Sequence, residues 1–193
     1  MHKGRLEAFS DAVIAIVMTI MVLELRPPHG ITADELRPLV PIFGAYILSF
    51  IFLGIYWNNH HHMLQAAKHV NGSVLWANMH LLFWLSLVPF VTAWMGDAGL
   101  QSVPVASYGF VLMLSGIAYY ILARCLVRAN GHDSTLARAL GHDFKGKISV
   151  VAYALGIGLA FLLPAASCMI YLAVALLWLV PDRRFERVLE PRA

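Results

Sequence analysis

Residues 5–25, RLEAFSDAVIAIVMTIMVLEL, form an apolar run with a polar and charged beginning. A helix of 21 residues rises about 1.5 Å per residue and can cross a hydrocarbon layer of about 30 Å. Its first third nevertheless carries four polar or charged side chains: Arg5, Glu7, Ser10 and Asp11. Acidic groups in membrane helices face protein or water rather than lipid. We therefore expect a membrane helix whose polar end is held by neighbouring helices.

Helical spacing predicts an apolar stripe on this helix, on the side away from the acid. Its members recur at intervals of three or four residues: Phe9, Val13, Ile16, Ile20 and Leu23. Thr19 borders the stripe. At about 100° per residue, Asp11 lies about 140° from Ile16, and Ser10 lies about 120° away on the other side. The residues alone leave open whether the stripe meets lipid, the protein core or something else.

The composition indicates a membrane protein. The chain has 193 residues, is 60% hydrophobic and only 13% charged, and has a mean hydropathy of +0.70. A soluble domain of this size exposes too much surface to be so apolar. We expect one all-α polytopic membrane domain over residues 1–193. Its two cysteines, Cys125 and Cys168, are expected at opposite membrane faces and unpaired.

The sequence lacks the motifs of several other function classes. No cluster of basic and aromatic residues indicates a nucleic-acid surface, so no nucleic acid is expected as a partner. The sequence contains neither a Walker loop nor a G-x-S-x-G motif, and we expect no enzymatic activity. No Cys-rich metal motif occurs either.

Apolar blocks and helix breakers predict six membrane spans. They are expected at about 5–25, 38–63, 70–94, 103–122, 148–163 and 165–180. The last apolar block, residues 148–180, has 33 residues, whereas one span needs about 20. Pro164 is the natural break within it. The alternative is one long kinked helix, which would give five spans and place the C-terminus outside.

The distribution of basic residues favours six spans with both termini in the cytoplasm. In that arrangement only Arg26 and Arg37 lie outside. Twelve basic residues lie inside: Lys3, Arg5, Lys68, Arg124, Arg128, Arg138, Lys145, Lys147, Arg183, Arg184, Arg187 and Arg192. Cytoplasmic segments of membrane proteins carry such an excess. Five spans would move the four arginines of the C-terminal tail outside and weaken the bias. We expect a multi-pass protein of the cell membrane.

The beginning of the first helix carries a motif. Arg5, Phe9, Ser10 and Asp11 complete the pattern R-x-x-x-F-S-D. In this motif and in its length the chain resembles the bacterial single-repeat relatives of the endolysosomal potassium channel, transmembrane protein 175. The resemblance implies a homotetramer in the lipid bilayer, with the first helix of each subunit around a central pore. It also implies conduction of K⁺ in preference to Na⁺, without a cofactor.

The resemblance also assigns pore residues. It implies a constriction at Ile16, with Thr19, Ile20 and Leu23 lining the pore beyond it; the apolar stripe contains three of these four residues. The sequence has no T-V-G-Y-G filter, so a hydrophobic constriction is the remaining device for selection. No helix repeats the arginines of a voltage sensor. The expected activity is a leaky, voltage-insensitive potassium channel.

A structural polar network is expected at the inner end of the first helix. Its expected members are Arg5, Phe9, Ser10 and Asp11 of the motif, with Trp57, His61 and Asn78 from the next two spans. His60, His61 and His62 could also suggest a metal site. However, consecutive helical residues point about 100° apart and cannot converge on one ion unaided. We therefore expect hydrogen bonding rather than metal binding.

Two other function classes remain open at this stage. An ion-coupled secondary transporter would use Asp11 as its coupling site, although the sequence shows no inverted repeat. A membrane metal or haem protein would use His61 and His80. The sequence also contains two His-Asp pairs, His132-Asp133 and His142-Asp143. Such pairs occur in phosphohydrolases, but no further acidic cluster accompanies them here. We interpret this segment as a solvated loop.

Overall fold

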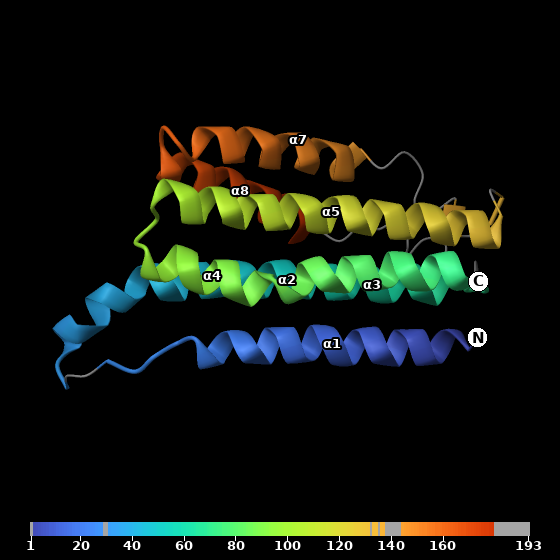
Figure 1. Cartoon of the computed structure of the whole chain (residues 1–193), viewed down its shortest axis with the longest axis horizontal. Helices are drawn as coiled ribbons and strands as arrows, with labels where there is room; N and C mark the ends of the chain where they lie inside the picture. Colours follow the sequence, from blue (N-terminus) through green and yellow to red (C-terminus); the bar gives the residue numbers. More distant parts are fainter. Residues whose placement is uncertain (1, 29–30, 132, 135, 138–143, 180–193) are drawn as a thin grey trace, which may run out of the picture.

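The computed structural model describes residues 2–28, 31–131, 133–134, 136–137 and 144–179. Within these residues the chain forms a bundle of roughly antiparallel helices (Figure 1). In order they are α1 (Lys3–Leu23), the 3₁₀ helix η1 (Ala33–Leu39), α2 (Val40–Ala66), α3 (Gly72–Ser86), α4 (Val88–Asp97), α5 (Ser102–Asn130), α7 (Phe144–Leu159) and α8 (Pro164–Leu179). When α3 and α4 are taken together as one segment, the described chain has six long helical segments. The predicted all-α fold is confirmed.

Two boundaries differ from the prediction. The third predicted span is divided at Leu87, because Pro89 has no N–H group and its ring disfavours a straight helix. α5 continues to Asn130 instead of ending near residue 122, and Gly131 then ends it with a φ of 92°, a conformation that glycine adopts readily. The last eight residues of α5 therefore extend beyond the span predicted at 103–122.

The last apolar block forms two helices rather than one kinked helix. α7 and α8 run in opposite directions and pack against each other (Figure 1). Leu163 donates its backbone N–H to the carbonyl oxygen of Leu159, which closes the turn before Pro164 begins α8. Proline is favourable at the first position of a helix, where its missing N–H costs nothing. The five-span alternative loses its structural basis.

Among the described residues, four helical segments are long and apolar enough to cross a membrane: Lys3–Leu23, Leu36–Ala66, Gly72–Asp97 and Ser102–Asn130. α7 and α8 have 16 residues each, fewer than the about 20 of a straight full span. They pack as a pair against α5. The two shorter helices therefore bury apolar side chains against the longer α5.

Close packing of α5, α7 and α8 depends on two glycines. A side chain at Gly109 or at Gly156 would overlap the ring of Tyr171, which is fully buried. The Tyr171 hydroxyl donates to the carbonyl oxygen of Val105 at 3.3 Å. Small residues allow such close approach between membrane helices.

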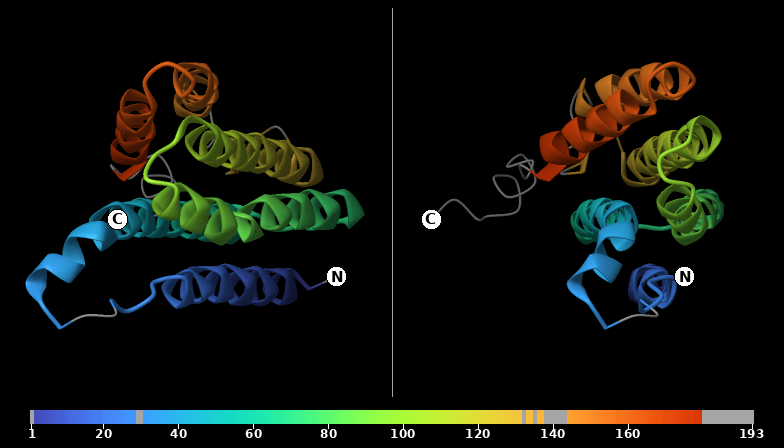
Figure 2. Two further views of the ribbon diagram at one scale, coloured as in Figure 1. Left: turned by 60° about the vertical axis from the view of Figure 1, so that its left-hand side comes forward. Right: turned by 90° about the vertical axis from the view of Figure 1, so that its left-hand side faces the viewer.

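The bundle has three layers, and α1 forms an outer one. Figure 2 shows α1 on one side of the layer made by α2, α3 and α4, with α5, α7 and α8 on the other side. The main neighbours of α1 within the described chain are accordingly α2, α3 and α4. One face of α1 therefore has no neighbour among the described residues.

Hydrogen bonds between helix ends and the loop after α2 define one end of the bundle. The side-chain amino group of Lys3 donates to the carbonyl oxygens of Gln65 and Ala67 at 3.3 and 3.1 Å. The side-chain oxygen of Asn130 accepts the backbone N–H groups of Lys68 and His69 at 2.7 and 2.8 Å. The start of α1, the loop between α2 and α3, and the end of α5 thus lie together, at the end that carries Lys3 and Lys68.

Candidate functional site

α1 buries one face against the bundle and leaves the opposite face uncovered. The buried side chains are Leu6, Ser10, Ile14, Val17 and Met21. Phe9, Ile16, Ile20 and Leu23 of the predicted stripe are exposed, Ile16 to 55% and Leu23 to 76%. Val13, at the edge of the stripe, packs partly against the core. The stripe therefore does not face the core of its own subunit, and its apolar side chains require lipid or another subunit as neighbours.

Thr19 places a polar oxygen on the uncovered face. Its hydroxyl donates a hydrogen bond to the carbonyl oxygen of Ile16 at 2.9 Å, and its side chain is exposed. Because the hydroxyl hydrogen is bound to the helix backbone, the lone pairs of the oxygen remain available as acceptors.

A strip of small residues borders the stripe on α1. Gly4, Ala8, Ala12 and Ala15 are all exposed. At about 100° per residue they lie between the side that faces α2 and the side that carries Ile16. Small side chains let membrane helices approach closely. The uncovered face thus has a bulky half and a half suited to contact with another helix.

A buried chain of hydrogen bonds joins α1 to α3 and α2. Ser10 Oγ donates to the carbonyl oxygen of Leu6 and accepts from Asn78 Nδ2, each at 2.8 Å. Asn78 Oδ1 in turn accepts from His60 Nε2 at 2.8 Å. Ser10, Asn78 and His60 are fully buried. Losing one of these partners would strand a buried polar group at a cost of about 1–3 kcal/mol.

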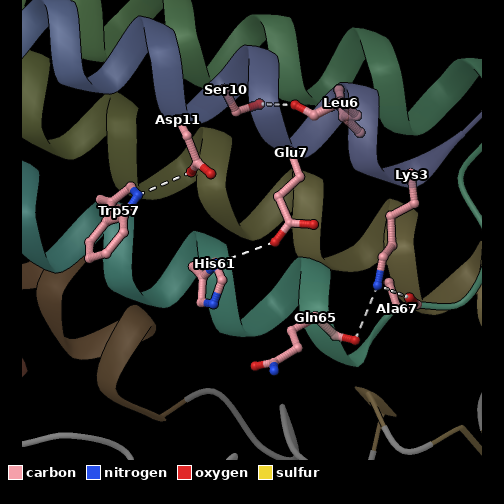
Figure 3. A network of polar contacts seen from close by, with 9 residues as sticks. All are labelled: Lys3, Leu6, Glu7, Ser10, Asp11, Trp57, His61, Gln65 and Ala67. Carbon is pink, nitrogen blue, oxygen red and sulfur yellow. Dashed lines mark hydrogen bonds and ion pairs between the residues drawn. The ribbon is translucent and has the colours of Figure 1, made fainter.

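Asp11 lies outside this buried chain. Its Oδ1 accepts a hydrogen bond from Trp57 Nε1 at 3.0 Å, where α1 meets α2 near the surface (Figure 3). Arg5 and Phe9, which were expected in the network, are exposed. Within the described chain neither forms a hydrogen bond or an ion pair with Ser10 or Asp11. The neutral Ser10, rather than the charged Asp11, is the buried anchor of α1.

The histidine that meets Asn78 is His60, one residue before the expected His61. Successive helical residues point about 100° apart, so His61 faces another direction. His61 Nδ1 lies 3.3 Å from Glu7 Oε1, and its ring stacks on Trp57 with centroids 6.0 Å apart. The expected grouping of Trp57, His61 and Asn78 is therefore divided between a buried chain and a surface contact.

The metal or haem alternative finds no site among the described residues. His80 is exposed and accepts a hydrogen bond from Trp84 Nε1 on its own helix at 2.9 Å. His61 is engaged with Glu7 instead of facing His80. No group of three or more His, Cys, Asp or Glu side chains in this part of the chain could hold a metal ion. His132, His142 and Asp143 lie outside the described residues.

Sequence reasoning missed Glu7, Lys3 and His60 as contact residues. The signal for the first two was present, because Lys3, Glu7 and Asp11 are spaced by four residues and share one side of the helix. Trp57, His61 and Gln65 repeat that spacing on α2. Figure 3 shows these two series facing each other.

A shallow groove of about 470 Å³ runs between α1 and the α3–α4 segment. Its walls are Val13, Ile16, Val17, Ile20 and Glu24 from α1 or its end, and Ser86, Pro89, Phe90 and Ala93 from the other segment. Ile16 and Ile20 thus belong to an apolar surface that extends beyond α1. Such a surface is suited to an apolar neighbour.

Comparison with known proteins places these features in a family. The sequence model of the family "Endosomal/lysosomal potassium channel TMEM175" matches residues 5–89. A protein named potassium channel from Chryseobacterium sp. is 53% identical over 190 residues, which cover 98% of this chain and 99% of that protein. One of the same name from Streptomyces collinus is 31% identical and covers 83% of each chain. The crystal structure of a lysosomal potassium-selective channel TMEM175 homolog from Chamaesiphon minutus has a TM-score of 0.81 and 25% identity, and the match covers 93% of this chain and 97% of that one.

Proposed function

We propose that four copies of this chain assemble around a pore lined by α1. The chain belongs to the TMEM175 family and is a potassium channel of the membrane. The observation that carries the proposal is the uncovered apolar stripe of α1 on a helix that is otherwise firmly anchored. Ser10 fixes one side of the helix in the subunit, while Ile16 and Leu23 point away from it. One helix cannot enclose a pore, so the pore requires several subunits.

The small strip of α1 supports close assembly. In a tetramer, each α1 would turn its bulky half toward the central axis and its small half toward a neighbouring subunit. Ala8, Ala12 and Ala15 would allow the helices to approach closely enough for the bulky side chains to meet. The groove beside Ile20 and Phe90 would accept apolar side chains of the neighbour.

The proposed constriction is a ring of four Ile16 side chains. These side chains offer no hydrogen bond, so a hydrated cation must lose part of its water shell there without replacement. K⁺ holds its water less tightly than Na⁺, so the barrier favours K⁺. Thr19 supplies acceptor oxygens beyond the ring, and Ile20 and Leu23 continue the lining. This device needs no carbonyl filter and no cofactor.

The test of the proposed function is ion flux through the reconstituted protein. Vesicles that contain the purified protein should conduct K⁺ well above protein-free vesicles, and Na⁺ more slowly. Chemical crosslinking should give species up to four subunits. Equal K⁺ and Na⁺ fluxes would contradict the proposed selectivity, and a dimer as the largest species would contradict the tetramer.

The proposed orientation places the end with Lys3 and Lys68 in the cytoplasm, because basic residues gather there. We expect His69→Cys, in the loop between α2 and α3, to react with an impermeant maleimide only after the cells are permeabilised. Gln101→Cys, between α4 and α5, should react in intact cells. Both side chains are exposed, and Asn130 binds only the backbone of His69. In a background without Cys125 and Cys168, the reverse labelling pattern would invert the proposed orientation.

A further inference from the structure

The last turns of α5 carry two arginines, Arg124 and Arg128, whose side chains are both exposed. Within the part of the chain that the structure describes, neither guanidinium group forms a hydrogen bond or an ion pair. Asp133, the next acidic residue along the chain, is also exposed and pairs with neither arginine. Two like charges one helical turn apart repel each other. An anion bound beside both arginines would relieve this repulsion.

The two arginines continue an exposed apolar stripe of α5. At about 100° per residue, Phe110, Ile121 and Arg128 lie within about 20° of one another around the helix axis, and Arg124 lies about 40° to one side. Phe110 and Ile121 are 46% and 38% exposed. This face of α5 is thus apolar along the span and basic at its end. A phospholipid has the same order of acyl chains and phosphate.

The length of α5 brings the arginines to the level of the lipid headgroups. α5 has 29 residues, which at 1.5 Å per residue make about 43 Å, whereas the hydrocarbon layer is about 30 Å thick. A span of about 20 residues that starts at Val103 ends near Tyr120. Tyr120 is 40% exposed, and tyrosine is enriched at membrane–water interfaces. Arg124 and Arg128 follow one and two turns beyond that boundary.

Helix geometry directs these arginine side chains back toward the membrane. Side chains on a helix lean toward its N-terminus, and the N-terminus of α5 lies at the opposite end of the bundle. Arg124 follows this rule, because its Cζ atom lies 5.9 Å from the centroid of the Tyr120 ring, one turn earlier. Such a cation–π contact holds the guanidinium group in place. The planar fork of arginine donors matches the oxygen atoms of a phosphate group.

The position of α5 in the bundle places this face toward lipid. Figure 2 shows α5 on the side of the α2–α4 layer away from α1. If α1 lines the pore, α5 lies on the outer side of the assembly. This step rests on the proposed function. The test below measures no ion current, so the two proposals can fail separately.

We propose that Arg124 and Arg128 bind the phosphate group of an anionic phospholipid, in the leaflet on the side of Lys68. The lipid's acyl chains would lie along the stripe of Phe110 and Ile121. A phosphate ion from solution would make no use of that stripe, which is why the geometry favours a lipid. The site is distinct from the pore and from the buried chain of hydrogen bonds between α1 and α3.

The test is native mass spectrometry of the detergent-purified protein with added phosphatidylglycerol or phosphatidylcholine. We expect the wild type to bind phosphatidylglycerol more tightly. Each arginine near an anionic lipid contributes about fivefold to binding. Arg124→Gln/Arg128→Gln should therefore weaken phosphatidylglycerol binding about 25-fold and leave phosphatidylcholine binding unchanged. Phosphatidylglycerol should also raise the melting temperature of the wild type, but not that of the double variant.

A matched control removes two exposed positive charges from other helices at the same end of the bundle. Arg5 begins α1, Lys147 lies in the first turn of α7, and both are exposed. Arg5→Gln/Lys147→Gln should keep the affinity for phosphatidylglycerol within about twofold of the wild type. A loss equal to that of the arginine pair would indicate diffuse surface charge and overturn the inference.

Three further outcomes would overturn the inference. The first is equal binding of both lipids by the wild type. The second is displacement of phosphatidylglycerol by inorganic phosphate, which would indicate a site for soluble anions. The third is an arginine-pair variant that folds but no longer assembles, because the face would then be a contact between subunits. If that variant fails to fold, Arg128→Gln alone decides, with an expected loss of about fivefold.

Discussion

Asparagine in place of Ile16 is expected to raise the unitary K⁺ current about tenfold and to bring the permeabilities for K⁺ and Na⁺ close together. A tenfold rise corresponds to a barrier lowered by about 1.4 kcal/mol. Asparagine supplies donors and acceptors where isoleucine offers none, so the ring would hold water. A cation could then keep most of its hydration shell, and the difference between K⁺ and Na⁺ would shrink.

The matched control is the same substitution at Ile47. Ile47 on α2 is 54% exposed and Ile16 is 55% exposed, so both variants place an amide on an uncovered apolar surface. Ile47→Asn should leave the current and the selectivity at wild-type values, because α2 does not line the proposed pore. The measurement is the unitary current and the reversal potential with K⁺ on one side and Na⁺ on the other. Wild-type behaviour in an assembled Ile16→Asn channel would remove Ile16 from the pore.

The fold was predictable where sequence signals are local. Pro164 stops one helix and begins the next, and the apolar runs around it are too long for one span. The end of α5 was not predictable from hydropathy, because a fall in hydropathy marks the end of apolar surface rather than the end of a helix. Arg124 and Arg128 are polar, yet both remain helical, and Asn130 bonds to the loop after α2. That contact comes from tertiary structure.

The candidate site was also predictable from local sequence signals but not where tertiary contacts decide. The direction of the Ile16 stripe follows from helical periodicity, which needs no knowledge of other helices. The choice between His60 and His61 depends on how α2 is rotated against α3, and a rotation of about 100° exchanges the two. Ser10 and Asp11 were both expected in the polar network, and periodicity did not say which of the two is buried. The buried position belongs to Ser10, since a hydroxyl is far less costly to bury than a carboxylate.

Alanine in place of Asn78 is expected to destabilise the subunit by about 2–4 kcal/mol, because it strands two buried partners. Ser10 would lose its donor and His60 its acceptor, and each such loss costs about 1–3 kcal/mol. For a chain of this size the melting temperature should fall by about 5–15 °C. The measurement is the fraction of assembled protein that remains in size-exclusion chromatography after heating in detergent.

The control variant for this prediction is Trp57→Phe. It removes the hydrogen bond to Asp11 and keeps an aromatic ring beside His61. Because Trp57 is exposed, water can replace the lost partner of Asp11, and the cost should stay below about 1 kcal/mol. Ser10→Ala should resemble Asn78→Ala, and the double variant should cost less than the sum of the two, since both break one hydrogen bond. If Trp57→Phe proved as damaging as Asn78→Ala, the charged contact at the surface, and not the buried chain through Ser10, would be the main anchor of α1.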